Sequence, residues 1–212
     1  MSTMTFYTNP QSRGRIVRWM LEEIGAPYDV RVLNFDGSIK RPEFLQLNPL
    51  GKVPTLVHDG AVITEVGAIC TYLADRFPEK GLAPAPDSPA RGTYYRWLFF
   101  IAGPLEMAMT ARAYQWRIDS DNARAVGCGM IDDTVATVER ALQSGAWLCG
   151  DQFTTADLLM ASYIGWQMMM QQLERKPVFV DYVARAESRV AAQRATELDD
   201  ALIPAQQAAS TK

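Results

Sequence analysis

The chain has 212 residues and a mixed composition that excludes several classes of protein before any motif is considered. It has 21 Lys and Arg residues and 24 Asp and Glu residues, which gives a formal net charge of −3. The chain therefore has no excess of positive charge that would indicate binding to nucleic acid. No apolar run reaches the about 18 residues of a membrane span, and the N-terminus lacks a signal-peptide pattern. We therefore expect a cytoplasmic protein of one or two domains that binds neither nucleic acid nor a membrane.

The cysteine and histidine content narrows the chemistry further. Cys70, Cys128 and Cys149 are far apart and have no metal-binding or redox spacing, which is typical of reduced thiols buried as small apolar side chains. His58 is the single histidine, so we expect neither Ser–His catalysis nor a metal site built from histidine ligands. We predict no metal site.

In the N-terminal region, short strand-like runs alternate with helical ones. We expect strands at Thr5–Thr8 and Tyr28–Leu33, joined by a helix over Ser12–Ile24 that ends at Gly25 as its C-cap. A crossover helix requires the two strands to run parallel. A short helix is expected near Pro42–Leu47.

A β-hairpin and another helix follow. Asp59-Gly60 lies between the runs VPTLVH and AVIT and is typical of a type I′ turn, so these runs should pair antiparallel. Pro54 has no N–H and holds Val53 extended at the entrance to the first strand, which leaves an edge able to pair with a peptide. Glu65 begins a helix whose first free amides favour a carboxylate. The predicted fold is an α/β domain with a mixed four-stranded sheet.

The rest of the chain has a different character. We expect the α/β domain over residues 1–80, a proline-rich linker over 81–89 and an all-helical bundle over 90–212, where apolar residues recur at helical spacing. Gly103-Pro104 is expected to interrupt the first long helix. The residues Thr154-Thr155-Ala156-Asp157 form a capping box that begins a later helix.

Four segments occur in an order and at spacings that are typical of one family. They are YTNPQSRGRIVRWMLEEIGAPY at 7–28, NPLGKVPTL at 48–56, TEVGAICTYLADRFP at 64–78 and GDQFTTADLLMAS at 150–162. Each is weak alone, but together the chain resembles a cytosolic glutathione S-transferase of bacterial type with a Ser-type active site. The resemblance implies a thioredoxin-like domain, a linker, a helical domain and a homodimer.

The resemblance also implies where glutathione, the co-substrate, binds. The cysteinyl backbone of the tripeptide would pair with Val53 ahead of a cis Pro54, and Lys52 would meet the glycyl carboxylate. The Val66 amide would hold the γ-glutamyl carboxylate, and Glu65 would accept from the ammonium group. Many relatives have Ser where this chain has Val66, which removes a hydroxyl contact worth about 0.5 to 1.5 kcal/mol.

In this family the reaction requires the glutathione thiolate, and Ser12 is the candidate that stabilises it. One hydrogen bond to a charged sulfur is worth about 1.5 to 3 kcal/mol, which lowers the thiol pKa by about 1 to 2 units. Ser12 follows the first strand at the position of the activating hydroxyl in Ser-type relatives, and Ser there also suits a helix cap. Asn9 and Tyr7 stay open as alternatives, and Arg13 and Arg15 would add positive potential.

An electrophile pocket is implied along the first long helix of the second domain, with Met107, Ala111 and Tyr114 as candidates. Core packing explains the same residues equally well. We predict a homodimeric transferase that conjugates glutathione to small hydrophobic electrophiles. The alternatives are a glutathione-dependent thiol oxidoreductase or peroxidase, and a non-catalytic interaction protein on the same fold.

Overall fold

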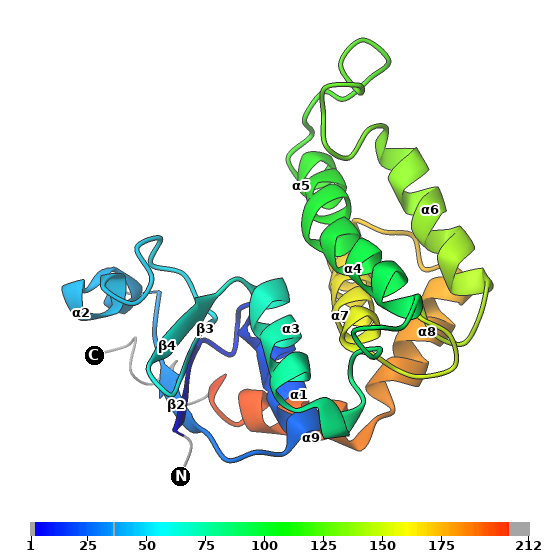
Figure 1. Ribbon diagram of the computed structural model, residues 1–212. Coiled ribbons are helices and arrows are strands. Elements are labelled where there is room, and N and C mark those ends of the chain that lie inside the picture. The colour runs from blue at the N-terminus through cyan, green and yellow to red at the C-terminus, as the bar shows by residue number, and fades with distance from the viewer. Residues whose placement is uncertain (1–2, 36, 204–212) are drawn as a thin grey trace. The chain divides into compact units, whose positions relative to one another are not determined.

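The computed structural model describes residues 3–35 and 37–203 (Figure 1). Contacts divide the chain into two units, of which unit 1 comprises Met1–Lys80 with Arg189–Lys212 and unit 2 comprises Gly81–Ser188. Each unit contains a buried apolar core. Among the described residues, no helix has both the length and the apolar character needed to cross a membrane.

Unit 1 contains a four-stranded sheet in the order β2-β1-β3-β4. The strands are β1 (Met4–Thr8), β2 (Asp29–Val32), β3 (Thr55–His58) and β4 (Ala61–Thr64). β1 pairs in parallel with β2 and antiparallel with β3, and β3 pairs antiparallel with β4. The predicted mixed sheet is confirmed, because a crossover helix joins the parallel pair and a tight turn joins the hairpin. In that turn Asp59 and Gly60 have φ values of 49° and 83°.

Helices complete the described part of unit 1. They are α1 (Gly14–Ile24), α2 (Pro42–Leu45), α3 (Val66–Arg76) and α9 (Val190–Asp200), with short 3-10 turns at Ser38–Lys40 and Pro78–Lys80. α1 and α3 contact each other (Figure 1). α1 buries an apolar stripe, and Gly25, with φ of 67°, ends the helix as its predicted C-cap. The stripe consists of Ile16, Val17, Met20, Leu21 and Ile24.

The last helix differs from the prediction, which assigned it to the helical domain over 90–212. In the structure α9 packs along α1 and belongs to unit 1 (Figure 1). Arg18 on α1 pairs with Asp199 at 3.2 Å, and Glu23 pairs with Arg189, just before α9, at 2.6 Å. An apolar stripe shows that a helix has a face to bury, but it does not show which surface covers that face.

Unit 2 is helical. Its helices are α4 (Ala90–Phe100), the one-turn π-helix η3 (Ile101–Leu105), α5 (Glu106–Ala113), α6 (Ile131–Gln143), α7 (Thr155–Met169) and α8 (Pro177–Glu187). Pro104 lies inside η3, where it removes one backbone donor, so the regular α-helical pattern is interrupted where the sequence predicts it.

The predicted capping box begins α7 and extends into a buried network. The Asp157 carboxylate accepts from the Thr154 amide at 2.8 Å and the Thr154 hydroxyl at 2.9 Å. It also accepts from the Leu148 amide at 2.7 Å and the Tyr182 hydroxyl at 2.6 Å. Asp157 is fully buried, and burial raises its pKa. One carboxylate therefore joins the start of α7 to the preceding loop and to α8.

Candidate active site

The two alternatives to Ser12 lie near the end of β1, Tyr7 within the strand and Asn9 in the turn that follows it. Asn9 is buried, its amide nitrogen donates to the Leu33 carbonyl at 2.8 Å, and its side-chain oxygen accepts from the Gln11 amide at 2.8 Å. The Asn9 side chain thus ties the turn to the end of β2. Tyr7 is half-buried, and its ring centroid lies 5.6 Å from that of Phe44. These contacts favour structural roles for both residues.

The Ser12 hydroxyl is half-buried in the same turn and makes two hydrogen bonds. It donates to the Asn9 carbonyl at 2.7 Å and accepts from the Gly14 amide at 2.9 Å, at the start of α1. Its proton reaches a sulfur only by leaving the Asn9 carbonyl. This exchange is favourable, because a hydrogen bond to a charged acceptor is worth about 1.5 to 3 kcal/mol against about 0.5 to 1.5 for a neutral one.

Gly14 allows α1 to begin close to the end of β1. A Cβ atom at this position would lie 2.0 Å from the Thr8 hydroxyl oxygen and 3.0 Å from the Ser12 hydroxyl oxygen. Any larger residue would displace one of these side chains. The missing side chain therefore lets Ser12 lie next to the last residue of the strand.

The predicted glutathione-pairing edge lies at the entrance to β3. Val53 and Pro54 are joined by a cis peptide bond, and no hydrogen bond joins the Val53 backbone to the described residues. The preceding carbonyl, that of Lys52, accepts from the Asn48 side-chain amide at 2.8 Å and from the Thr55 hydroxyl at 3.2 Å. The Lys52 side chain is exposed. The segment is thus held in place while the Val53 backbone stays available to an extended peptide.

The start of α3 provides free amides beside an unusual backbone conformation. Glu65 is exposed and has φ of 67° and ψ of 125°, a conformation that costs a non-glycine residue about 1 to 3 kcal/mol and is found most often at binding sites. Val66 is the first helical residue, so its N–H has no partner within the helix. Its side chain is 9% exposed and packs in the core, so the residue offers a ligand its amide alone.

The sheet register places these three segments at one end of the sheet. Tyr7 lies opposite Thr55, and Thr55 lies opposite Thr64. The turn after β1, the Val53-Pro54 entrance to β3 and the start of α3 after β4 therefore meet at the same end. The six predicted glutathione-site residues belong to these three segments.

Comparison with known proteins identifies the family. Residues 2–75 match the family model described as glutathione S-transferase, N-terminal domain. Glutathione S-transferase 1 of Dianthus caryophyllus is 32% identical over 154 residues, which cover 70% of this chain and 69% of the relative. The chain belongs to the glutathione S-transferase family.

Solved structures agree with this family assignment. A glutathione transferase from Methylococcus capsulatus is 28% identical, with a TM-score of 0.78 over 93% of this chain and 99% of that chain. A sphingomonad glutathione S-transferase complexed with glutathione is 25% identical, with a TM-score of 0.75 over 92% of this chain and 98% of that chain. The predicted fold class and the predicted enzyme class, a glutathione S-transferase, are confirmed.

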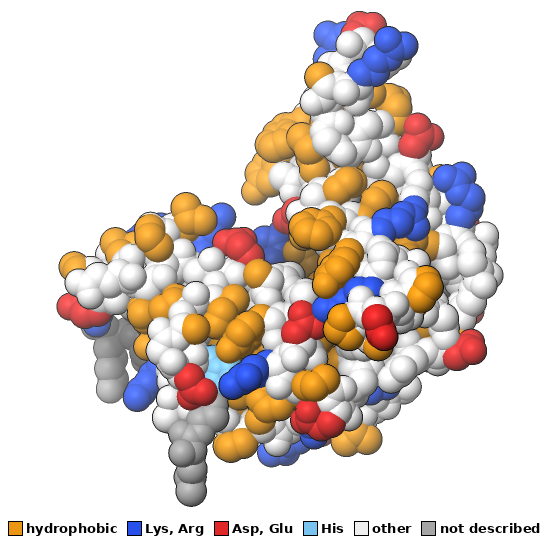
Figure 2. All heavy atoms as spheres, in the orientation of Figure 1, with side chains coloured by type: hydrophobic (Ala, Val, Ile, Leu, Met, Phe, Trp, Pro, Cys, Tyr) orange, Lys and Arg blue, Asp and Glu red, His pale blue; other side chains and the backbone are white. Residues whose placement is uncertain are grey.

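In this glutathione S-transferase the three electrophile-pocket candidates differ in exposure. Ala111 is fully buried, so it packs in the core of unit 2 and does not line an open pocket, contrary to the prediction. Met107 is half-buried, and Tyr114 is 74% exposed, with its ring stacked on Trp116 at 6.5 Å between centroids. Figure 2 shows hydrophobic side chains on the surface of the α4 and α5 region. Met107 and Tyr114 stay candidates.

The sequence predicts only that Arg15 adds positive potential near the turn. In the structure its Nε donates to the Pro10 carbonyl at 2.6 Å, and its Nη2 pairs with Asp200. No sequence signal could have found this contact, because Asp200 is 185 residues away in the chain.

The cysteines lie outside the turn that follows β1. Cys70 and Cys128 are buried and Cys149 is half-buried. Burial raises the pKa of Cys149 to about 11 and raises that of Cys70 still further above its ordinary value. Because the thiolate is the reactive form, Cys149 in the folded protein should be a weak nucleophile near neutral pH.

We expect iodoacetamide to alkylate Cys149 on the order of 100-fold more slowly at pH 8 than it alkylates an unperturbed cysteine. The rate should rise about tenfold per pH unit until the pH approaches that raised pKa, because the ionised fraction rises in that proportion. Mass spectrometry after timed alkylation measures the rate, with the urea-unfolded protein as the reference. A rate that levels off near the ordinary pKa of cysteine would contradict this prediction.

Proposed function

We propose that this glutathione S-transferase binds glutathione where the Ser12 turn, the Val53-Pro54 edge and the Glu65–Val66 helix start meet, and that it conjugates the thiolate to small hydrophobic electrophiles. The observation that carries the proposal is the register that brings these three segments together at one end of the sheet. The sphingomonad relative, whose solved structure is a complex with glutathione, supports the choice of co-substrate.

Each charged group of the tripeptide has a complementary group at this end of the sheet. The Val53 backbone pairs with the cysteinyl backbone, and the exposed Lys52 ammonium meets the glycyl carboxylate. The γ-glutamyl carboxylate lies at the start of α3, where the Val66 amide and the helix dipole favour a negative charge. The exposed Glu65 carboxylate accepts from the γ-glutamyl ammonium group.

Ser12 stabilises the reactive form of the bound thiol. On ionisation of the sulfur, the Ser12 hydroxyl turns from the Asn9 carbonyl to the thiolate, and the thiol proton passes to solvent. The thiolate electron pair then forms the new carbon–sulfur bond with the electrophile. In an aryl halide the carbon–halogen bond breaks and the halide leaves with its electron pair, and in an activated double bond the displaced π pair takes a proton from solvent. The hydroxyl keeps its bond from the Gly14 amide during this exchange, so the helix start stays in place.

The electrophile, the assembly and the location belong to the same proposal. Met107 and Tyr114 present adaptable apolar groups, which suit small hydrophobic electrophiles. A homodimer and a cytoplasmic location stay predictions from the sequence.

A direct comparison of two reactions tests the function. The purified protein should be retained on immobilised glutathione and should conjugate glutathione to an aryl halide faster than it reduces a glutathione mixed disulfide. Faster disulfide reduction would favour an oxidoreductase. Absence of both reactions, with no retention, would favour a non-catalytic interaction protein.

The matched variant for this test is Lys52→Met, which removes the ammonium group and keeps a side chain of similar length. Its KM for glutathione should rise about tenfold, because a charge-assisted hydrogen bond is worth about 1.5 to 3 kcal/mol. Arg41→Met is the control, since it removes an exposed positive charge elsewhere in unit 1. Equal effects of the two variants would contradict the assignment of Lys52.

A further inference from the structure

Arg15 links the C-terminal helix to the turn that contains Ser12. Its Nε donates to the Pro10 carbonyl at 2.6 Å, and its Nη2 pairs with the Asp200 carboxylate at the end of α9. Pro10 is buried and follows Asn9 directly, and the Asn9 carbonyl receives the Ser12 hydroxyl. The Pro10 carbonyl, which accepts from Arg15, is thus the next carbonyl in the chain after that of Asn9, which accepts from the Ser12 hydroxyl.

The geometry of the guanidinium couples the two bonds of Arg15. Nε and Nη2 are adjacent donors on one edge of a rigid planar group, so fixing the direction of one N–H fixes that of the other. The Arg15 side chain is 34% exposed and forms its ion pair with Asp200. The neighbouring Asp199 also attracts the Arg15 charge, but its carboxylate is paired with Arg18. Asp200 therefore decides whether Nε points at the Pro10 carbonyl.

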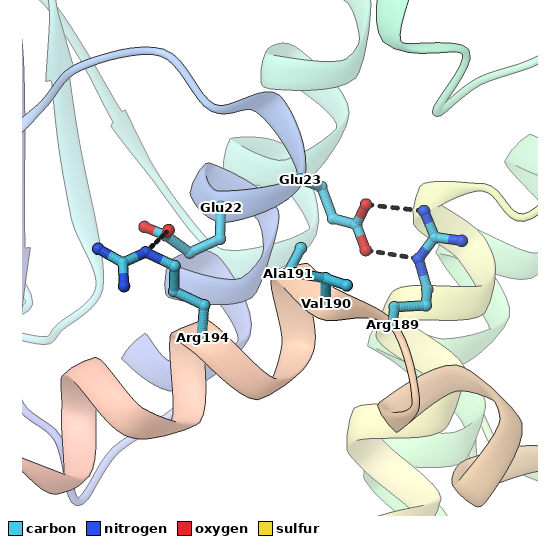
Figure 3. A pocket seen from close by; sticks show the side chains of 6 residues that line it. All are labelled: Glu22, Glu23, Arg189, Val190, Ala191 and Arg194. Carbon is cyan, nitrogen blue, oxygen red and sulfur yellow. Dashed lines mark hydrogen bonds and ion pairs between the residues drawn. The ribbon is translucent and has the colours of Figure 1, made fainter.

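α9 is anchored on α1 independently of Arg15. Three further ion pairs of the described residues join α1 to α9 or to the residue before it. Arg18 and Asp199 are 3% and 1% exposed. Figure 3 shows the other two pairs, which join Glu22 and Glu23 in the C-terminal part of α1 to Arg194 and Arg189. These three pairs are Arg18–Asp199 at 3.2 Å, Glu22–Arg194 at 3.4 Å and Glu23–Arg189 at 2.6 Å. The helix that carries Asp200 is thus anchored by other residues, and it brings the Asp200 carboxylate, which is 57% exposed, to the Arg15 guanidinium.

We propose that Asp200 is a positioning residue that acts through Arg15 to hold the Ser12 turn in its active geometry. This inference rests on the proposed function. With Asp200 in place, Arg15 keeps its bond to the Pro10 carbonyl, and the turn keeps Ser12 within reach of the sulfur. Lys52 and the Val53 edge lie outside this linkage, so it affects the sulfur and not the binding of the tripeptide.

The test compares two substitutions of Asp200. Asp200→Ala removes the acceptor, and we expect kcat for conjugation to fall about three- to tenfold with the KM for glutathione nearly unchanged, because small displacements of an activating group reduce rates steeply. Asp200→Asn keeps an oxygen that accepts from Nη2 and should retain at least about half of the wild-type kcat. Charge alone predicts the opposite sign, since removing a negative charge near the turn would favour the thiolate.

Arg194→Ala is the matched control. It removes the ion pair between α9 and Glu22, which lies in the C-terminal part of α1, whereas Ser12 precedes the first residue of α1. It should leave kcat unchanged. Amide hydrogen exchange gives a readout that does not depend on activity: exchange at the Ser12 amide, which donates to the Asn9 carbonyl at 3.1 Å, should speed up in Asp200→Ala and not in Arg194→Ala.

The outcomes separate the inference from the function on which it rests. The inference alone would be overturned if the wild-type enzyme conjugates glutathione and Asp200→Ala has the same kcat and the same hydrogen exchange at the Ser12 amide. Equal kcat losses in Asp200→Ala and Asp200→Asn would also overturn it, because the acceptor oxygen that Asn keeps for the Arg15 Nη2 would then make no difference to the rate. A wild-type protein without glutathione conjugation would overturn the proposed function, and the inference with it.

Discussion

Replacing Asp157 with Ala is expected to lower the free energy of unfolding by about 3 to 5 kcal/mol. The carboxylate accepts hydrogen bonds from the Thr154 amide and hydroxyl, from the Leu148 amide and from the Tyr182 hydroxyl, and Asp157 is fully buried. Removing it leaves these donors without their acceptor in a region that excludes water. Part of the loss is offset because the buried charge, whose pKa burial raises, is removed as well.

Urea unfolding followed by circular dichroism measures this loss. Thr154→Ala is the graded control, because it removes one of the hydrogen bonds and should lower the free energy of unfolding by about 1 kcal/mol. Tyr182→Phe removes another donor and leaves the aromatic packing in place. If Asp157→Ala lowered the free energy of unfolding by less than Thr154→Ala does, the desolvation cost of the carboxylate would outweigh its hydrogen bonds.

Replacing Ser12 with Ala is expected to lower kcat for conjugation about tenfold near neutral pH, with the KM for glutathione nearly unchanged. In the structure the hydroxyl proton already has the Asn9 carbonyl as its acceptor at 2.7 Å. Ionisation of glutathione therefore gains only the difference between a charged and a neutral hydrogen bond, about 1 to 1.5 kcal/mol. The pKa of the bound thiol should rise by about one unit in the variant.

The ultraviolet absorbance of the bound thiolate, recorded against pH, measures that pKa directly. Ser12→Thr retains a hydroxyl and should restore most of the rate. Tyr7→Phe and Asn9→Ala test the alternatives, and Asn9→Ala should also destabilise the turn because Asn9 holds Leu33 and Gln11. Full activity in Ser12→Ala together with a rate loss in Tyr7→Phe would assign the role to Tyr7.

Local sequence patterns predicted most of the secondary structure of this protein. Asp59-Gly60 determined the hairpin because its residues tolerate the positive φ values that the turn needs. Gly25 ended α1 for the same backbone reason. These features depend on residues only a few positions apart in the chain, so their physics is contained in a short stretch of sequence.

The candidate site was predictable only in part. The Val53-Pro54 segment and the Glu65 helix start were recognisable from their order and spacing. The hydrogen bonds made by the residues next to them, such as those to the Lys52 carbonyl, follow only from the folded structure. Ser12 was predicted from its place in the turn. The acceptor of its hydroxyl proton, the Asn9 carbonyl, follows from the backbone geometry of the folded turn. The burial of Ala111 depends on which helices cover α5, so periodicity did not reveal it.

The order of strands and helices and the turns between them follow from the amino-acid sequence, because each depends on residues that are near neighbours in the chain. The family resemblance follows from the order and spacing of four motifs. That α9 packs on α1 and that Asp200 meets Arg15 is seen only in the folded chain. An apolar stripe or a charged side chain specifies only the kind of partner that it needs. Which partner it obtains depends on the packing of segments far apart in the chain, where burial of the whole face outweighs any single contact.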